Sequence, residues 1–239
     1  MNIALIGYGK MGHAIEKIAL KRGHNIALCI TSANRHEMDK EHLRMADIAI
    51  EFSSPESGRG NVLRCLEAGL SVVSGTTGWN ERLQEAYDAA NTHKAAFLHA
   101  SNFSIGVNIF FEVNKLLASL MNRNPEYDIS IVETHHTQKK DAPSGTAITL
   151  AEQIVEKLGR KKTWALNNVN EKQAIPIFAH RIDNIPGTHK ITYSSAIDDI
   201  EITHTAHNRD GFALGAVLAA EFIAGKHGVF SMKDVLGIK

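Results

Sequence analysis

One stretch of fifteen residues, ETHHTQKKDAPSGTA at residues 133–147, gathers proton-carrying side chains directly before an apolar helical pattern. His135 and His136 are neighbours in sequence, so in an extended strand they point to opposite faces and cannot easily share one task. Lys139 follows a few residues later as a mobile cation. Imidazoles and an amine are groups that can move protons at a bound ligand. The stretch therefore predicts a catalytic or anion-binding segment.

The helix that follows this stretch begins with residues that suit an anion. Pro143 fits the first helical position, where its missing N–H costs nothing. Ser144, Gly145 and Thr146 would then supply backbone N–H groups and a hydroxyl at the helix N-terminus. With Lys139 a few residues upstream, this arrangement predicts binding of a substrate that carries a carboxylate.

Two other interpretations of the segment are open. Adjacent histidines can suggest zinc, but no pair of helical ligands at i and i+4 and no cysteine spacing accompanies them, so we expect no metal. An exposed strand end followed by a helix capped by Asp141 and Ser144 would explain those two residues. It would not explain why His135, His136 and Lys139 occur together.

A second motif, GYGKMG at residues 7–12, follows the strand-like run NIALIG and opens a helical pattern. Glycines in this context allow a tight turn and close approach of the backbone to a pyrophosphate, which the helix N-terminus then faces. A glycine-rich turn that binds nothing is the alternative. The predicted dinucleotide-binding residues are Gly7, Tyr8, Gly9, Lys10, Met11 and Gly12.

The second predicted strand ends near Thr31, where a site that prefers NAD usually places an acidic residue against the ribose. Here the sequence continues Thr-Ser-Ala-Asn-Arg-His. Ser32 and Arg35 are suited to a 2′-phosphate, which favours NADPH without excluding NADH. Arg35 could equally be a solvated loop residue.

Two further loops follow later predicted strands, in the sequences SGTTGW (74–79) and ASNFSIG (100–106). Ligands of open parallel sheets gather at the carboxyl ends of the strands, so these small, hydroxyl-rich loops can lie along a nicotinamide ribose and ring. Ordinary turn chemistry would also explain them. The candidate cofactor residues here are Gly75, Thr76, Thr77, Ala100, Ser101, Asn102 and Phe103.

The elements that must position these residues fall into two patterns. Up to about residue 105, short β-branched runs alternate with amphipathic helical patterns, which is typical of βαβ units around a parallel sheet. From residue 106 a long apolar helix, an isolated strand, a helix and three strand-like runs follow, and the three runs predict an antiparallel meander. The fold class is therefore α/β, with a Rossmann-like nucleotide-binding domain (1–105 and 207–239) and an inserted α+β domain (106–206).

The composition narrows the class of protein. The 239 residues include 26 basic and 26 acidic side chains, so no global basic field would attract nucleic acid or an anionic membrane. The sequence predicts neither a membrane span nor a signal peptide. Cys29 and Cys65 stand in apolar contexts that suit reduced thiols, so we expect a cytoplasmic protein.

Taken together, the motifs resemble the 4-hydroxy-tetrahydrodipicolinate reductase (dihydrodipicolinate reductase) family over nearly the whole chain. The resemblance rests on GYGKMG, EFSSPE, SGTTGW, ASNFSIGVN, ETHHTQKKDAPSGTA and HNRDGFALGAV. It implies reduction of a small cyclic dicarboxylate by NADPH or NADH, with loss of water, in diaminopimelate and lysine biosynthesis. It also implies a homotetramer joined through the sheet of the inserted domain.

The resemblance also implies roles for single residues. It assigns proton transfer to His135, substrate contact to His136, proton donation to Lys139, and carboxylate binding to Gly145 and Thr146. The cofactor segments fall on residues 7–12, 75–77 and 100–103. The phosphate loop is one residue shorter than is common in the family and residues 31–46 are compact, so the preference between the two dinucleotides stays open.

Two other functions are compatible with the glycine-rich turn. One is a different two-domain dehydrogenase that acts on an acidic amino acid, which would give no reason for the pattern at residues 133–147. The other is a non-catalytic sensor that binds NAD(P)H without turnover.

Overall fold

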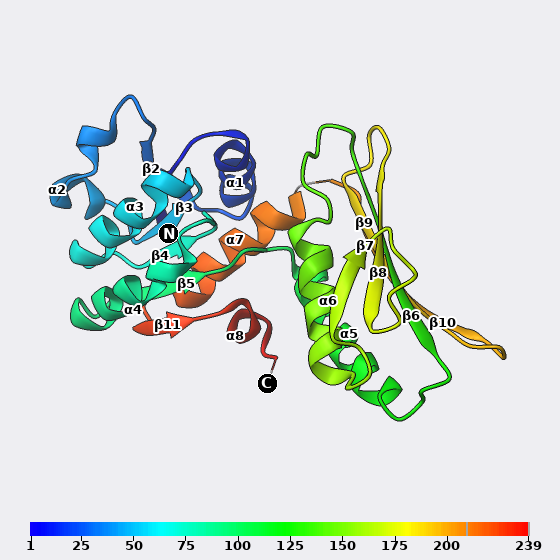
Figure 1. Ribbon diagram of the computed structural model, residues 1–239. Coiled ribbons are helices and arrows are strands. Elements are labelled where there is room, and N and C mark those ends of the chain that lie inside the picture. Colours follow the sequence, from blue (N-terminus) through cyan, green and yellow to red (C-terminus); the bar gives the residue numbers. More distant parts are fainter. Residues whose placement is uncertain (209, 239) are drawn as a thin grey trace. The chain divides into compact units, whose positions relative to one another are not determined.

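A computed structural model describes residues 1–208 and 210–238 (Figure 1). The chain divides into two compact units, which are described separately. The first unit holds Met1–Ile105 and the C-terminal segment that begins at Asp210, and the second unit begins at Gly106 and lies between them in the sequence. Cofactor binding by the first unit and substrate binding by the second remain predictions.

The first unit is built on a parallel sheet, which confirms the predicted Rossmann-like architecture. Its described strands run in the order β11-β5-β4-β3-β1-β2, and every pairing is parallel. The strands are β1 (Asn2–Ile6), β2 (Asn25–Ile30), β3 (Ile48–Glu51), β4 (Val72–Ser74), β5 (Ala96–His99) and β11 (Gly228–Phe230). The helices are α1 (Lys10–Lys21), α2 (Lys40–Leu43), α3 (Pro55–Glu67), α4 (Leu83–Thr92), α7 (Asp210–Ile223) and α8 (Met232–Leu236), with short 3₁₀ turns at Arg35–Glu37 and Asn80–Arg82.

Helices cover both faces of this sheet, because its central strands are apolar on both sides. Side chains of α3 and α4 belong to the core cluster on one face, and those of α1 and α7 belong to the cluster on the other. Gly215 in α7 permits close contact, since a Cβ there would lie 1.7 Å from the Phe103 carbonyl oxygen. The returning helix α7 thus packs against the end of the first segment, as the sequence predicted.

The second unit holds a mixed sheet with strand order β10-β9-β6-β8-β7. Its strands are β6 (Asp128–His135), β7 (Thr163–Leu166), β8 (Ala174–Arg181), β9 (Gly187–Ser194) and β10 (Asp199–Ala206), and its helices are α5 (Ile105–Met121) and α6 (Gly145–Lys157). The predicted meander is wrong, because β6 lies between β8 and β9 and pairs with β8 in parallel. The crossover through α6 returns the chain in the direction of β6, which produces parallel neighbours.

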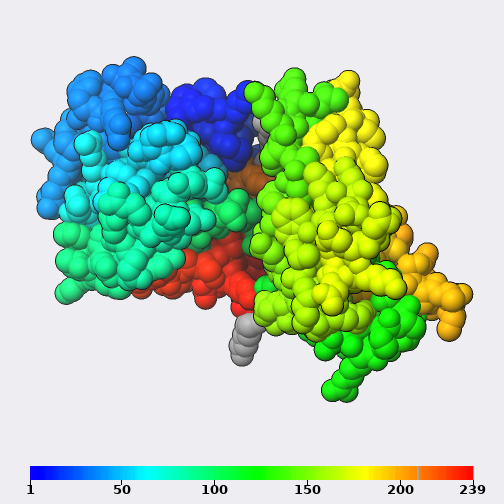
Figure 2. Space-filling model, viewed as in Figure 1, coloured from blue at the N-terminus to red at the C-terminus, as the bar shows by residue number. Residues whose placement is uncertain are grey.

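The hairpin of β9 and β10 is antiparallel along its whole length, as the sequence predicted. The end of the hairpin, coloured gold to orange, projects from the body of the second unit (Figure 2). Ile197 at its turn is 88% exposed. None of the described helices combines the length and hydrophobicity that crossing a bilayer requires.

Strand β6 positions the residues that opened the sequence analysis. Its side chains alternate between a buried face and a less buried one, and the buried face carries Ile129, Ile131, Glu133 and His135. The two isoleucines belong to the core between the sheet and the helices. The same face that forms the core therefore ends in an acid and an imidazole.

Candidate functional site

The glycine-rich turn of the first unit is shaped for a backbone-mediated contact. Gly7 follows β1 with φ of +90°, and a Cβ there would lie 2.0 Å from the Phe52 carbonyl oxygen. A Cβ on Gly12 would lie 2.6 Å from the Gly7 carbonyl oxygen. Helix α1 begins at Lys10, and its N-cap residue, Gly9, makes no side-chain hydrogen bond. The first amides of α1 therefore face a crowded, glycine-dependent turn without a capping side chain.

Two hollows adjoin this turn. One is lined by Gly7, Tyr8 and Gly9 together with Ser32 and Arg35. The other is lined by Gly9, Lys10 and Met11 together with Gly75, Thr76 and Thr77. The structure thus brings the predicted residues of these three segments to one edge of the sheet.

The fourth predicted cofactor segment is placed differently. Ala100, Ser101, Asn102 and Phe103 line neither hollow. The Phe103 side chain is 2% exposed and belongs to the core of the first unit. A contact between Phe103 and a cofactor would therefore have to involve its backbone.

Glu51, which the sequence analysis did not single out, organises the loops beside the second hollow. Its side chain is fully buried at the end of β3 and accepts hydrogen bonds from the hydroxyls of Ser53, Ser74 and Thr76. The Thr76 hydroxyl also accepts a hydrogen bond of 2.8 Å from the Ser53 amide. The Thr76 side chain therefore fastens the loop, and its neighbours Gly75 and Thr77 are more open to a ligand.

In the second unit, the segment at residues 133–147 closes on itself, because Glu133 at its start contacts Ser144 near its end. Glu133 is fully buried, and both of its carboxylate oxygens lie 3.1 Å from the amide nitrogen of Ser144. Burial opposes the ionisation of Glu133, but contacts with His189 and Ser144 outweigh it and lower the pKa to about 2. Glu133 is therefore an anion that ties the end of β6 to the start of α6.

Arg181, the last residue of β8, holds the loop between these two elements. Its Nη2 lies 3.1 Å from Glu133 Oε1 and also donates to the carbonyl of Asp141. Its Nε donates to the carbonyl of Lys139 at 3.3 Å. One guanidinium therefore joins a buried acid to two points of the loop that carries the predicted catalytic lysine.

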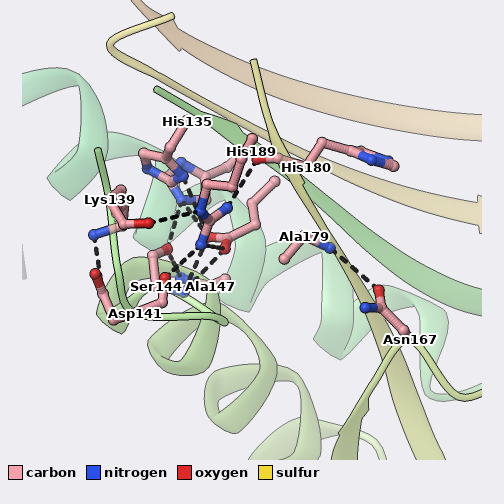
Figure 3. Close-up of polar contacts among 11 residues, drawn as sticks. His135, Lys139, Asp141, Ser144, Ala147, Asn167, Ala179, His180 and His189 are labelled. Carbon is pink, nitrogen blue, oxygen red and sulfur yellow. Dashed lines mark hydrogen bonds and ion pairs between the residues drawn. The ribbon is translucent and has the colours of Figure 1, made fainter. Parts of the chain in front are cut away.

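His135 and His189 lie side by side above Ser144 (Figure 3), with ring centroids 5.0 Å apart in an edge-on arrangement. His135 is 8% exposed, and its Nδ1 lies 3.5 Å from Glu133 Oε2 without a hydrogen bond. Burial lowers the pKa of His135 from 6.5 to about 4, and repulsion from His189 adds to this effect against the attraction of Glu133. The ligand-free protein therefore holds His135 as a neutral imidazole near pH 7.

Lys139 pairs with Asp141 at a distance of 2.9 Å, at one side of the cluster (Figure 3). The Lys139 side chain is 23% exposed, so its ammonium can be reached from solvent. His136 is half-buried, and its Nδ1 is buried without a hydrogen-bond partner among the described residues. Of the three candidates, Lys139 is the one that forms an ion pair with an exposed partner.

Helix α6 begins later than predicted, at Gly145, with Ser144 rather than Pro143 at its boundary. The Ser144 hydroxyl is the N-cap, which accepts from the Ala147 amide at 3.2 Å. Ser144 is 2% exposed and its amide donates to Glu133, so substrate binding by Ser144 stays a prediction that would have to use its hydroxyl. Asp141 pairs with Lys139 and does not cap the helix.

Two backbone amides at the start of α6 are available to a ligand. Within the described chain, those of Gly145 and Thr146 have no acceptor. Gly145 is exposed and no atom lies within 4 Å of the position of its absent Cβ. An anion can therefore approach this helix N-terminus closely.

Glu133, His135 and His189 also present three potential metal ligands within 4.8 Å of one another. The sequence did not bring these three together, because His189 lies more than fifty residues further along the chain. The Glu133 carboxylate, however, already accepts hydrogen bonds from Ser144 and Arg181. A divalent cation would have to displace these donors and tolerate the positive charge of Arg181.

Sequence reasoning named neither Arg181 nor His189. The register of the sheet places them beside the motif. Glu133 of β6 lies opposite His189 of β9, and His135 of β6 lies opposite Arg181 of β8. The sequence does carry one signal of this site. An acid, Glu133, occupies a core position of an otherwise alternating strand.

Comparison with known proteins matches both units to the same family. Models of dihydrodipicolinate reductase match the chain, the N-terminal model over residues 1–103 and the C-terminal model over residues 106–236. A 4-hydroxy-tetrahydrodipicolinate reductase of Christiangramia forsetii is 49% identical over 237 residues, covering 99% of this chain and 98% of the relative. One of Chromobacterium violaceum is 38% identical over 202 residues, covering 81% of this chain and 74% of the relative.

Among solved structures, a dipicolinate-bound dihydrodipicolinate reductase from Paenisporosarcina sp. TG-14 matches with a TM-score of 0.80. It covers 97% of each chain at 22% sequence identity, which supports the fold. The two family models together span both units, and the first relative matches nearly end to end. The chain belongs to the dihydrodipicolinate reductase family.

Proposed function

We propose that this protein reduces 4-hydroxy-tetrahydrodipicolinate to tetrahydrodipicolinate with NADPH or NADH, in the biosynthesis of diaminopimelate and lysine. In the net reaction a hydride replaces the C4 hydroxyl, which leaves as water, and one proton is consumed. The proposal rests on the groups that come together at one end of the second unit's sheet. There a charged lysine, a buried imidazole and a helix N-terminus come together, and the first two amides of that helix are unpaired within the described chain. These groups suit a dicarboxylate that must receive a proton.

The residues would divide the work as follows. The amides of Gly145 and Thr146 bind one substrate carboxylate, and His136 contacts the substrate beside them. Lys139 is the proton donor, because its ammonium is charged and accessible before substrate binds. His135 is neutral in the free protein, so it first orients the substrate or accepts a hydrogen bond from it. It takes up a proton once the negative charge of the bound dianion is present.

The first unit fits a dinucleotide. Added Cβ atoms would fill the turn at Gly7 and Gly12, and the hollow beside it contains a buried acceptor, Asn61 Oδ1, without a partner among the described residues. When bound, the dinucleotide supplies the hydride. The hollow holds Ser32 and Arg35, and none of the described residues that line it is acidic, which favours a 2′-phosphate and therefore NADPH.

We further propose that the protein is a cytoplasmic homotetramer joined through the sheet of the second unit. The side of β9 and β10 that faces away from the helices carries Lys190 and Thr192, whose side chains both donate to Glu201 across the strands. This face is polar and partly exposed, so partner subunits would meet it through hydrogen bonds as well as apolar contacts. Light scattering of the purified protein measures the expected tetramer. Cys29 and Cys65 are both free, which suits a reducing compartment.

The test of the activity is a coupled assay. Pyruvate, aspartate semialdehyde and the preceding synthase generate the substrate, and the absorbance of NADPH or NADH reports turnover. We expect oxidation that depends on the synthase and is faster with NADPH. Absence of oxidation with both cofactors would refute the proposal. Cofactor binding without turnover would then support a sensor, and oxidation with an acidic amino acid would support a different dehydrogenase.

A further inference from the structure

We propose that Arg181 is a positioning residue for this reaction, which fixes the backbone of Lys139 relative to the start of α6, and that Glu133 is the acid that holds Arg181 in place. The inference rests on the proposed function and adds a requirement to it. The lysine and the helix N-terminus must be held at a fixed spacing, because they act on different parts of one small substrate.

The contacts of Arg181 span the whole segment. Its Nε reaches the carbonyl of Lys139 at 3.3 Å, and its Nη2 reaches the carbonyl of Asp141 and the carboxylate of Glu133. Its Nη1 donates to its own neighbour, the His180 carbonyl, at 2.8 Å. All the guanidinium nitrogens are therefore engaged, and two of the four acceptors are in the loop that carries Lys139.

Glu133 extends this connection to the helix. The same carboxylate that accepts from Arg181 accepts from the Ser144 amide, one residue before α6 begins. A displacement of the guanidinium would therefore shift the Lys139 backbone. Through Glu133, it would also shift the amides of Gly145 and Thr146. The planar fork of arginine suits this arrangement, whereas the compact ammonium of lysine does not.

The loop at residues 136–143 has few other attachments within the described chain. The Lys139 amide donates to the His136 carbonyl at 3.1 Å, and the Thr137 hydroxyl contacts Asp183. The Lys139 side chain pairs with Asp141, which is itself 58% exposed and belongs to the same loop. None of these three contacts ties the middle of the loop to a strand of the sheet, whereas Arg181 does so at two carbonyls.

Arg181 has a second effect, which is electrostatic. Glu133 is fully buried, and a buried carboxylate without a partner is strongly destabilising. A purely structural role for Arg181 would be to neutralise this charge. The two roles are separable, because removal of both charges leaves no unpaired acid but still releases the loop.

The experiment compares Arg181→Ala, the double variant Glu133→Gln with Arg181→Ala, and the control Arg160→Ala. Arg160 is a matched control, because its guanidinium also donates to backbone carbonyls of the second unit, those of Met121, Asn124 and Tyr127. The readouts are kcat, KM for each substrate and the melting temperature. The coupled assay with the wild-type protein is run first.

We expect Arg181→Ala to lower kcat about 10- to 100-fold, the scale of a misplaced catalytic group, with KM for NADPH unchanged. The double variant should regain melting temperature but not kcat. Arg160→Ala should lose melting temperature with kcat near that of the wild type. Guanidinium chloride at low, non-denaturing concentration should raise kcat of Arg181→Ala, and sodium chloride at equal ionic strength should not.

Recovery of kcat in the double variant would overturn the inference, because Arg181 would then act only by neutralising Glu133. Wild-type kcat in Arg181→Ala would overturn it as well. If the wild-type protein itself shows no turnover, the proposed function fails instead. The pKa of His135 gives a further readout, since Arg181 is among the charges that lower it and its removal should raise it.

Discussion

The ligand-free protein should resist protonation of His135, and this resistance can be measured. The imidazole is 8% exposed, next to His189 and within reach of the positive charges of Lys139 and Arg181. Its pKa is lowered to about 4, and the carboxylate of Glu133 at 3.5 Å only partly opposes the shift. Near pH 7 the imidazole is therefore neutral.

The cost of protonation follows from the shift. A fall in pKa from 6.5 to about 4 corresponds to roughly 3 kcal/mol against the protonated form. At pH 7 only about one molecule in a thousand would carry the proton. A pKa lowered by folding means that the unfolded chain binds more protons between pH 6.5 and 4. This part of the stability is therefore complete above pH 6.5 and is lost as the pH falls to about 4.

Substrate changes this balance, because it brings negative charge. A carboxylate at about 4 Å from the ring, at an effective dielectric constant of about 20, favours the imidazolium by about 4 kcal/mol. This magnitude equals or exceeds the cost of protonation. We therefore expect a bound dicarboxylate to raise the pKa of His135 to near or above 6.5, so that the residue can take up a proton only in the complex.

The assay is an NMR titration of protein labelled with ¹⁵N in histidine, with and without dipicolinate. The thirteen histidines require an assignment, which the spectrum of His135→Gln supplies by difference. We expect one imidazole that stays neutral from pH 8 to 5 in the free protein and titrates at higher pH in the complex. A His135 that titrates near 6.5 in the free protein, or one that dipicolinate does not shift, would refute the reasoning.

Three other variants test separate groups. Lys139→Ala should lower kcat about 10²-fold or more, as loss of a general acid does, and kcat near that of the wild type in the coupled assay would exclude it as proton donor. The pKa of Glu133 is lowered from 4.5 to about 2, so the wild type should lose stability as the pH falls through this range. Glu133→Gln should lack this acid-dependent loss of stability. If urea unfolding gave both proteins the same fall in unfolding free energy between pH 5 and 2.5, this expectation would be wrong. Arg35→Ala should raise KM for NADPH about tenfold and leave KM for NADH nearly unchanged, the size expected for one hydrogen bond to a charged phosphate. An equal change for both cofactors in steady-state kinetics would place Arg35 outside the 2′-phosphate site.

The architecture of the first unit could be predicted because its signals are local. Apolar strands such as Ile3–Ile6 are buried on both faces, and the glycines at positions 7 and 12 are required by close backbone contacts. These features depend on residues near in sequence and on a rule of parallel sheets. The short strand β11 was missed, since three residues after a helix give no periodicity to read.

The topology of the second unit could not be predicted in the same way. Three consecutive strand-like runs favour a meander, but β6 enters the sheet between two of them. Which strand edges pair is decided by the crossover through α6 and by the burial of one face, and neither is visible in a single run of residues. The partners of Glu133 depended on this register, so Arg181 and His189 could not be found from the motif alone.

Both units place a fully buried glutamate toward the carboxyl end of a strand, at positions where strand patterning favours an apolar side chain. Glu51 gathers three hydroxyl groups under the loops beside the glycine-rich turn, and Glu133 gathers an amide and a guanidinium under the predicted catalytic loop. A local conflict of this kind persists when the surrounding donors satisfy the acid, and such conflicts are expected at functional sites. An acidic residue at a strand position where an apolar side chain is expected is therefore the sequence signal that marks the loops next to Glu51 and Glu133 as candidate functional loops. The spacing of the motif residues around it does not reveal which distant donors complete the site.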